Sequence, residues 1–260
     1  MNPSNIQAAA ILWQHWTELT VIDQLPVHCR PTNRAEAYAI QAEWARLSGQ
    51  KTVGWKIAAT SLAGQKHIGV DGPLAGHLLA NRVLENWANI SLAGNRMRVA
   101  EAEFAFRFGQ SLPLRETPYT VKEVLAAVDT LHPAIEIPDS RYHDFIRVGA
   151  PQLIADDACA SWFVLGEATT VAWRKMDLIT HRVDAYKNGL RIGSGTGVNV
   201  LGDPRVALTW LVNEVSRYGN GIQADQFVTT GTCIVPIAIT ESDIVGADFD
   251  EIGRINVSFT

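Results

Sequence analysis

The stretch from Glu101 to Phe108 alternates strictly between two kinds of side chain. One side of an extended chain carries three phenylalanines, and the other carries Glu101 and Glu103, two residues apart. Because successive side chains of a strand point to opposite faces, this predicts a strand with its aromatic face in the core. Two neighbouring carboxylates repel each other unless a cation lies between them, which indicates a divalent-metal site. The competing interpretation is a wet polar face on which Glu103 pairs loosely with Arg107.

A third glutamate and a single lysine lie in apolar segments of their own. Glu136 stands between two isoleucines and two prolines, well downstream of the first pair. Three carboxylates of this kind suit a hard ion such as Mg²⁺, although spacing alone gives no geometry. Lys56 lies inside the apolar segment 52–60, where burial requires an anionic partner or a substrate. Partial desolvation is expected to lower its pKa. The alternative is an edge lysine whose ammonium reaches water.

Composition narrows the function classes. The chain has 260 residues, 47% of them hydrophobic and 19% charged, which is typical of a globular protein with a large core. Its net charge of −5 and scattered basic residues argue against nucleic-acid binding. Three cysteines, far apart, fit a reducing compartment. No signal-peptide pattern or membrane-length apolar run is visible, so we expect a cytoplasmic protein that does not engage a membrane.

Helices and strands must position these side chains. Helices are predicted over about 2–19, 32–48, 61–68, 120–128 (capped by Thr120, with Glu123 at the capping-box position) and 204–218. Strands are predicted over 158–165, 170–173, 227–232 and 255–259, with a hairpin over 183–191 that turns at Asn188-Gly189. Residues 194–199 are expected to form a flexible polar loop. We divide the chain into an N-terminal helical arm, 1–50, and a catalytic unit, 51–260.

Several motifs occur in an order that resembles a known family. They are Gly54-Trp55-Lys56-Ile57, Gly69-Val70-Asp71, Glu101-x-Glu103, Pro133-Ala134-x-Glu136-x-x-Asp139-Ser140-Arg141, Val164-Leu165-Gly166, Val200-Leu201-Gly202-Asp203-Pro204 and Thr230-Gly231. The pattern resembles the 2-hydroxypenta-2,4-dienoate hydratase and 4-oxalocrotonate decarboxylase family of the fumarylacetoacetate hydrolase superfamily. It runs from about residue 34 to the C-terminus.

The resemblance implies an α+β fold, a mixed β-roll or sandwich of the fumarylacetoacetate hydrolase type with the helical arm in front. It implies Mg²⁺ or Mn²⁺ held by Glu101, Glu103 and Glu136, which would act as a Lewis acid on a 2-oxo or 2-hydroxy dienoate. On the same basis we predict Lys56 and Asp71 as catalytic residues. The residues predicted to bind substrate are Lys56, Asp139, Arg141 and Ser161. A homo-oligomer and a complex with a sister decarboxylase or hydratase are the expected assemblies.

The predicted reaction is hydration in the meta-cleavage degradation of aromatic compounds. Lys56 or a neighbouring acid would move protons between C3 and C5, and water would add at C4. Three alternatives stay open: a 4-oxalocrotonate-type decarboxylase, an acylpyruvate C–C hydrolase and a non-catalytic partner subunit. Hydratases of this family often have an acid where this chain has Leu74, and Asn and Ser where it has Asp157 and Cys159. These departures bear on the reaction more than on the metal.

Overall fold

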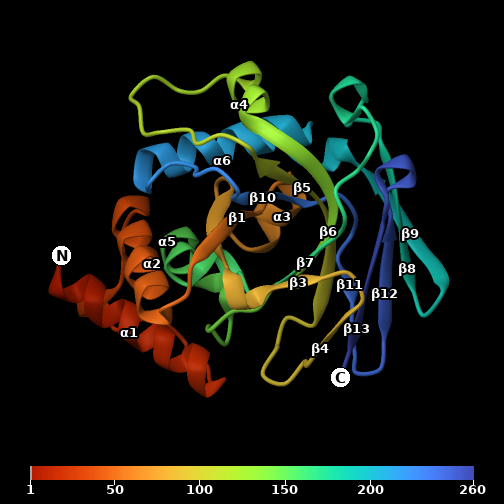
Figure 1. The fold of residues 1–260 in the computed structure, drawn as a ribbon. Helices are drawn as coiled ribbons and strands as arrows, with labels where there is room; N and C mark the ends of the chain where they lie inside the picture. Colours follow the sequence, from red (N-terminus) through yellow and green to blue (C-terminus); the bar gives the residue numbers. More distant parts are fainter. Residues whose placement is uncertain (1) are drawn as a thin grey trace.

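The computed structural model describes residues 2–260, which form two β-sheets, with the helices gathered on the side of the first sheet (Figure 1). The first sheet contains β1 (Thr52–Ala58), β2 (Leu74–Leu79), β3 (Val83–Glu85), β5 (Val99–Phe108), β6 (Val128–Ile137), β7 (Trp162–Leu165), β10 (Phe227–Thr232) and β11 (Ile237–Ala238). Its order is β2-β1-β10-β5-β6-β7-β3, and β11 pairs with β5 off this path. The second contains β4 (Ala88–Ile90), β8 (Arg182–Lys187), β9 (Leu190–Thr196), β12 (Ile244–Asp248) and β13 (Arg254–Phe259), in the order β4-β13-β12-β8-β9.

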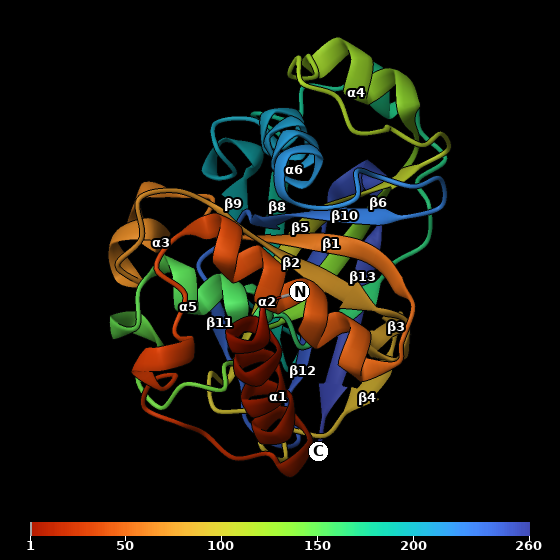
Figure 2. The same ribbon diagram turned by 90° about the vertical axis from the view of Figure 1, so that its left-hand side faces the viewer.

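The helices are α1 (Pro3–Glu18), α2 (Arg34–Ser48), α3 (Leu62–His67), α4 (Val121–Ala127), α5 (Ala150–Ala155) and α6 (Pro204–Tyr218). The predicted helices are therefore confirmed, and the content of helices and mixed sheets is α+β as expected. Figure 2 shows α1 and α2 together on one side of the first sheet. Within residues 2–260, no helix is both long enough and apolar enough to span a membrane.

The N-terminal arm packs through tryptophans. Trp13 and Trp16 of α1 meet Trp44 of α2 edge to face, with ring centroids 5.6 and 5.2 Å apart. Asn2 caps the start of α1, and Gly49 ends α2 in the left-handed conformation. The buried side chains of both helices belong to the same continuous core as the sheets. Helices α1 and α2 are thus attached to the sheets by packing.

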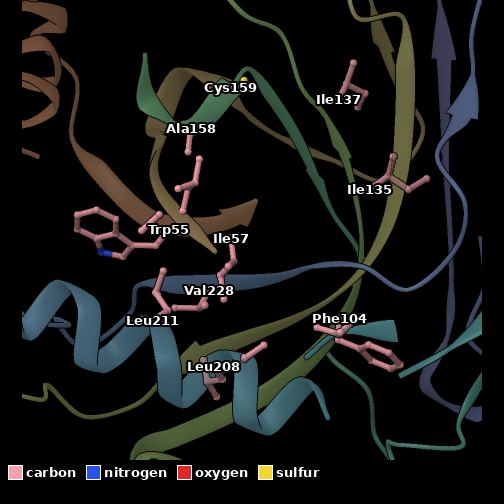
Figure 3. Close-up of a cluster of buried hydrophobic side chains, with 14 of the residues drawn as sticks. Trp55, Ile57, Phe104, Ile135, Ile137, Ala158, Cys159, Leu208, Leu211 and Val228 are labelled. Atoms are coloured by element: carbon pink, nitrogen blue, oxygen red, sulfur yellow. The ribbon is translucent and has the colours of Figure 1, made fainter. Parts of the chain in front are cut away.

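The central strand β5 is buried on both faces. Phe104, Phe106 and Phe108 are fully buried, as predicted, and Phe104 packs edge to face on Phe249 with centroids 5.2 Å apart. Figure 3 shows Phe104 in the core, with Leu208 and Leu211 of α6 directed toward the sheet. The opposite face is also closed, because Glu103 and Ala105 have no exposed surface. The interpretation of a wet polar face is therefore wrong.

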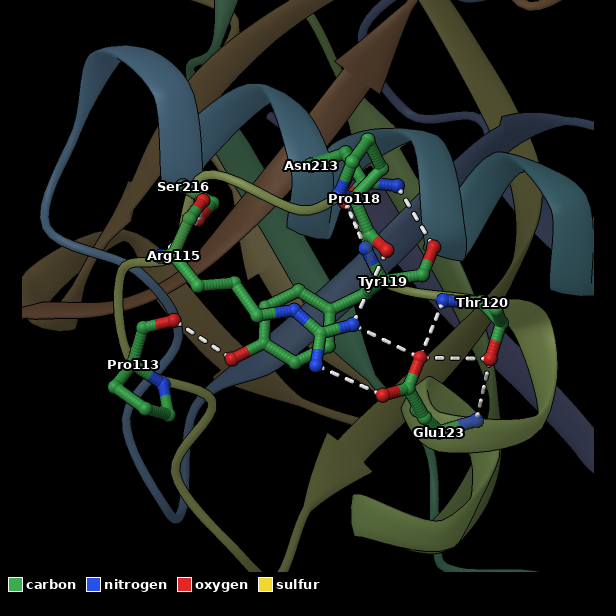
Figure 4. A network of polar contacts seen from close by, with 8 residues as sticks. All are labelled: Pro113, Arg115, Pro118, Tyr119, Thr120, Glu123, Asn213 and Ser216. Atoms are coloured by element: carbon green, nitrogen blue, oxygen red, sulfur yellow. Dashed lines mark hydrogen bonds and ion pairs between the residues drawn. The ribbon is translucent and has the colours of Figure 1, made fainter.

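The capping box predicted at α4 is confirmed. The Thr120 hydroxyl accepts from the backbone N–H of Glu123, and the Glu123 carboxylate accepts from that of Thr120. Arg115 donates to both oxygens of Glu123 at 2.8 Å, and its guanidinium lies over Tyr119 (Figure 4). Asn213 of α6 donates to Tyr119 O and accepts from Tyr119 N. This network ties the loop before α4 to α6.

Three local predictions need correction. Residues 170–173 form no strand, because after β7 the chain makes only isolated bonds to the β6 carbonyls, and Trp173 begins a short 3-10 helix. Ser194 to Thr196 belong to β9 and pair with β8, so they are not a flexible loop. Gly195 is needed there for close approach, since a Cβ would lie 1.9 Å from the Cys233 carbonyl oxygen. The predicted strand at 158–165 begins only at Trp162, after a turn at Asp157–Cys159.

Candidate active site

The three glutamates converge because of the pairing between β5 and β6. Glu101 lies directly opposite Glu136 in the antiparallel register, and Glu103 is two residues along on the same face of β5. Oxygen atoms of the three side chains lie within 4.8 Å of one another. The strand pattern read from the sequence thus brings the predicted carboxylates to one point.

One oxygen of Glu103 is fixed and the other is left free. Its Oε2 accepts from the Thr229 hydroxyl and from the Gly231 N–H, the latter at 2.8 Å. Both donors come from β10, which pairs with β5 on the side away from β6. Gly231 has φ +91° and a Cβ there would overlap Thr60, so glycine is required. Oε1 of Glu103 and Oε2 of Glu136 are buried without a hydrogen-bond donor in the part of the chain that the structure describes.

The three carboxylates of the cluster repel one another, and a positive charge between them would stabilise their ionised form. Burial, followed by repulsion from Glu136, raises the pKa of Glu101 to about 7 and that of Glu103 well above its usual range. Burial also raises the pKa of Glu136, against the opposing effect of the Lys56 ammonium. All the candidate ligands are carboxylate oxygens that lie close together, and some of them have no hydrogen-bond donor. Hard divalent ions prefer ligands of this kind. The residues present therefore fit a divalent cation.

Lys56 lies beside this cluster on β1. Its Nζ is 3.0 Å from Oε1 of Glu136 and donates to the Ala158 carbonyl oxygen at 3.0 Å. Only 2% of its surface is exposed, so it is not an edge lysine. Burial lowers the pKa of Lys56, but the charges of Glu136 and Glu101 outweigh it and the net shift is upward. The direction is opposite to the lowering expected from the sequence.

Comparison with known proteins gives the family. No protein-family model matches the chain. A 2-keto-4-pentenoate hydratase of Paraburkholderia xenovorans (strain LB400) is 31% identical over 230 residues, which is 87% of this chain and 84% of that protein. A 2-hydroxyhexa-2,4-dienoate hydratase of Comamonas testosteroni is 31% identical over 86% of each chain. A 4-oxalocrotonate decarboxylase of a Pseudomonas species is 30% identical over 82% of this chain and 80% of its own. The chain belongs to this hydratase–decarboxylase family.

Solved structures confirm the fold expected for the hydratase–decarboxylase family. The 4-oxalocrotonate decarboxylase of Pseudomonas putida G7, complexed with magnesium and adipate, matches with a TM-score of 0.88 and 25% identity. The match covers 98% of this chain and 97% of that one. A fumarylacetoacetate hydrolase from Exiguobacterium antarcticum shares the fold at a TM-score of 0.58 over 81% of this chain and 76% of its own. Two of these relatives are hydratases, which are hydro-lyases, and the third is a decarboxylase, which is a carboxy-lyase. All three are lyases, and this chain is therefore a lyase as well.

Two residues predicted to bind substrate are held in buried networks in this member of the family. Asp139 accepts from the backbone N–H of Arg96 at 2.8 Å and is 8% exposed. Arg141 is 5% exposed, donates to the Asp139 carbonyl oxygen and lies over the Trp16 ring at 4.1 Å. Its Nε is 3.5 Å from Asp156. Their geometry fixes the arm to the strand that carries Glu136, and substrate contact stays a prediction.

The other predicted residues lie at the periphery. Asp71 is exposed in the turn between α3 and β2. Ser161 is half-buried immediately before β7. The structure does not bring either of them into the carboxylate cluster among residues 2–260, and their roles stay predictions. His67 packs edge-on against Phe145 with centroids 6.5 Å apart.

Sequence reasoning missed the side chains that hold the cluster in place. Thr229 and Gly231 reach Glu103 from 126 and 128 residues along the chain. The pair formed by His77 and Asp157 spans 80 residues. The only sequence signal was the Thr230-Gly231 dipeptide and the unusual Asp157, which mark positions without giving their partners.

Proposed function

We propose that this protein is a divalent-metal-dependent hydratase that converts a 2-hydroxy-2,4-dienoate into a 4-hydroxy-2-oxo acid. The observation that carries the proposal is the convergence of Glu101, Glu103 and Glu136, with buried oxygens that lack donors and Lys56 beside them. Relatives that are hydratases of such acids support the substrate class. The proposed setting is the meta-cleavage degradation of aromatic compounds.

We propose Mg²⁺ or Mn²⁺ as the ion, because all three candidate ligands are carboxylates and the solved decarboxylase is complexed with magnesium. When bound, the ion would supply Lewis acidity toward the oxygen atoms of a 2-oxo acid. Thr229 and Gly231 hold Oε2 of Glu103 and so fix the orientation of its carboxylate. The position of Oε1 is therefore set before a metal binds. Such preorganisation avoids the cost of ordering the side chain on binding.

Lys56 is the proposed proton-handling residue. Hydration requires a proton at C5 of the dienol, which gives a conjugated 2-oxo-3-enoate, and then hydroxide at C4 with a proton at C3. The ammonium of Lys56 is fixed by Glu136 and by Ala158, so its third N–H remains available for a substrate. A positioned group of this kind typically contributes about 10²–10⁴-fold to the rate. Asp71 is the second proposed catalytic residue, and substrate contacts by Asp139, Arg141 and Ser161 remain part of the proposal.

A second candidate reaction is decarboxylation of a 2-oxo-3-hexenedioate. The solved structure that matches with a TM-score of 0.88 is a decarboxylase holding adipate, a six-carbon dicarboxylate. The curated relatives include both activities at nearly equal identity. The two reactions use the same type of 2-oxo acid and differ in whether water enters or CO₂ leaves.

Product analysis distinguishes the candidates. Purified protein is incubated separately with 2-hydroxypentadienoate, with 2-oxohexenedioate and with an acylpyruvate, each with Mg²⁺ or with a chelator. A 4-hydroxy-2-oxo acid formed only with Mg²⁺ supports the hydratase, and CO₂ release from the dioate supports the decarboxylase. Cleavage of an acylpyruvate would indicate the C–C hydrolase. Lack of turnover in every mixture would contradict the enzymatic proposal and leave the non-catalytic partner subunit.

We further propose a cytoplasmic homo-oligomer that can associate with a sister decarboxylase or hydratase. The free cysteines Cys29, Cys159 and Cys233 fit a reducing compartment. The edge strand β9 exposes Leu190 by 72% and Ile192 by 51%, which suits contact with another chain. Size-exclusion chromatography with light scattering tests the oligomeric state, and co-purification with the sister enzyme tests the complex.

A further inference from the structure

Behind Lys56 lies a segment whose backbone is unusual. Asp157, Ala158 and Cys159 have φ values of +53°, +50° and +62°, three consecutive non-glycine residues in the left-handed region. Each such residue carries a steric penalty between Cβ and the backbone. The local sequence gives no reason for this conformation, so contacts from elsewhere must maintain it.

Those contacts come from β2. Oδ1 of Asp157 accepts from the backbone N–H of His77 at 2.7 Å and from its ring nitrogen Nδ1 at 2.9 Å. Asp157 is 1% and His77 8% exposed, and the imidazole packs on Trp55 with centroids 4.3 Å apart. Gly76 permits the approach, because a Cβ there would lie 2.1 Å from the Asp157 carbonyl oxygen.

The segment held in this way faces Lys56. The Ala158 carbonyl accepts from Nζ, and it is one of two groups that fix the ammonium, the other being Glu136. In the register between β1 and β2, Lys56 pairs with Gly76, and the next pair is Trp55 with His77. Lys56 and His77 thus lie at adjacent positions of one strand pair, and His77 binds Asp157, the residue before the carbonyl group that Lys56 contacts.

We propose that His77 and Asp157 are positioning residues for Lys56. By holding the left-handed turn 157–159, they aim the Ala158 carbonyl so that Nζ stays beside Glu136 in the orientation that turnover requires. The inference rests on the proposed function, in which Lys56 handles the proton. Neither His77 nor Asp157 belongs to the three-carboxylate cluster, so neither would be a ligand of the metal.

The first test compares two buried histidines. His77→Phe retains an aromatic ring against Trp55 and the backbone hydrogen bond but loses the Nδ1 bond. The control is His132→Phe, whose Nδ1 is 2.8 Å from the Gly166 carbonyl oxygen, away from Lys56. We expect kcat to fall about tenfold in His77→Phe, the effect of one hydrogen bond, with KM changed less than threefold. In His132→Phe thermal stability falls and kcat is unchanged. An equal fall of kcat in both variants overturns the proposal.

The second test asks whether Asp157 acts through its hydrogen bond or through its charge. It also asks whether the effect of His77 on kcat depends on Lys56. Asp157→Asn keeps an acceptor oxygen for His77, so its kcat should stay within threefold of the wild type, whereas Asp157→Ala should lose at least tenfold. In a Lys56→Met background, His77→Phe should lower kcat no further, because the residue through which it acts is gone. If the two substitutions lower kcat by independent factors that multiply, His77 does not act through Lys56.

A third readout does not require turnover. In protein labelled with ¹³Cε-lysine, the Lys56 signal is assigned by its absence in Lys56→Met. We expect this signal to shift or broaden in His77→Phe and to remain unchanged in His132→Phe. If the wild type turns over neither substrate, the proposed function fails. The spectrum still tests whether His77 and Asp157 position Lys56. An unchanged Lys56 signal in His77→Phe refutes the positioning role.

Discussion

Replacing Lys56 by methionine should separate chemistry from folding. Methionine keeps most of the side-chain volume, so little cavity forms. It removes the ammonium that lies 3.0 Å from Glu136, where the two side chains are 2% and 1% exposed. At saturating Mg²⁺ we expect metal binding to persist and kcat to fall about 10²–10⁴-fold, the usual contribution of a positioned acid–base group.

The same substitution should change stability in a metal-dependent way. Without metal, Glu136 loses its charge partner in a buried site, and breaking such a pair typically costs about 3–5 kcal/mol. Because a cation compensates the same carboxylates, added Mg²⁺ should stabilise Lys56→Met more than it stabilises the wild type. Thermal unfolding with and without Mg²⁺ measures this difference.

The kinetic assay follows loss of dienoate absorbance at saturating Mg²⁺. The matched control is Lys51→Met, an exposed lysine next to the start of β1, which should behave as wild type in both assays. Wild-type kcat in Lys56→Met would refute the assignment of Lys56 to the chemistry. Equal Mg²⁺ stabilisation of Lys56→Met and wild type would refute the claim that ammonium and metal share the same carboxylates.

Three further outcomes are expected. Changing the cluster glutamates to glutamine one at a time, Glu103→Gln included, should weaken Mn²⁺ binding sharply by calorimetry, since a neutral amide removes a ligand charge, and unchanged affinity in all three would contradict the site. Phe104→Ala should lower the free energy of unfolding by about 3–5 kcal/mol, whereas the exposed Leu190→Ala should change it little; a near-neutral Phe104→Ala would contradict its place in the core. The hydrogen bonds from Arg115, with those from Thr120, lower the pKa of Glu123 from its usual 4.5 to about 2. Its contribution to stability is therefore present above pH 4.5 and lost as the pH falls toward 2, so Glu123→Gln should lower Tm at pH 7 but not at pH 2, and an equal decrease at both would be inconsistent with this reasoning.

The central strand was predictable because its signal is local. Alternation from Glu101 to Phe108 gives the strand, its buried aromatic face and the shared face of two glutamates, all from a period of two residues. The capping box at Thr120 and the hairpin turn at Asn188-Gly189 were predictable for the same reason. In each case the partners lie within a few residues of one another.

The prediction failed where a residue type has more than one use. Ser194, Gly195 and Thr196 were expected to be a loop because glycine and serine are common in loops, but Gly195 serves to admit the Cys233 carbonyl against a paired strand. Residues 170–173 have strand-forming side chains yet find no neighbouring strand. Strand propensity describes a side chain that fits a sheet, and only the rest of the fold supplies the sheet.

The candidate active site combines a local sequence pattern with contacts from distant parts of the chain. The alternation that carries Glu101 and Glu103 is local, and cross-strand pairing then adds Glu136 at a position that β-sheet geometry requires. The groups that orient these side chains follow no local rule, since Thr229, Gly231 and the His77–Asp157 pair reach the site across 80 residues or more. A chain can therefore display its candidate metal ligands in the sequence while the parts that would set the rate, the orientation of Glu103 and of Lys56, become visible only in the folded structure.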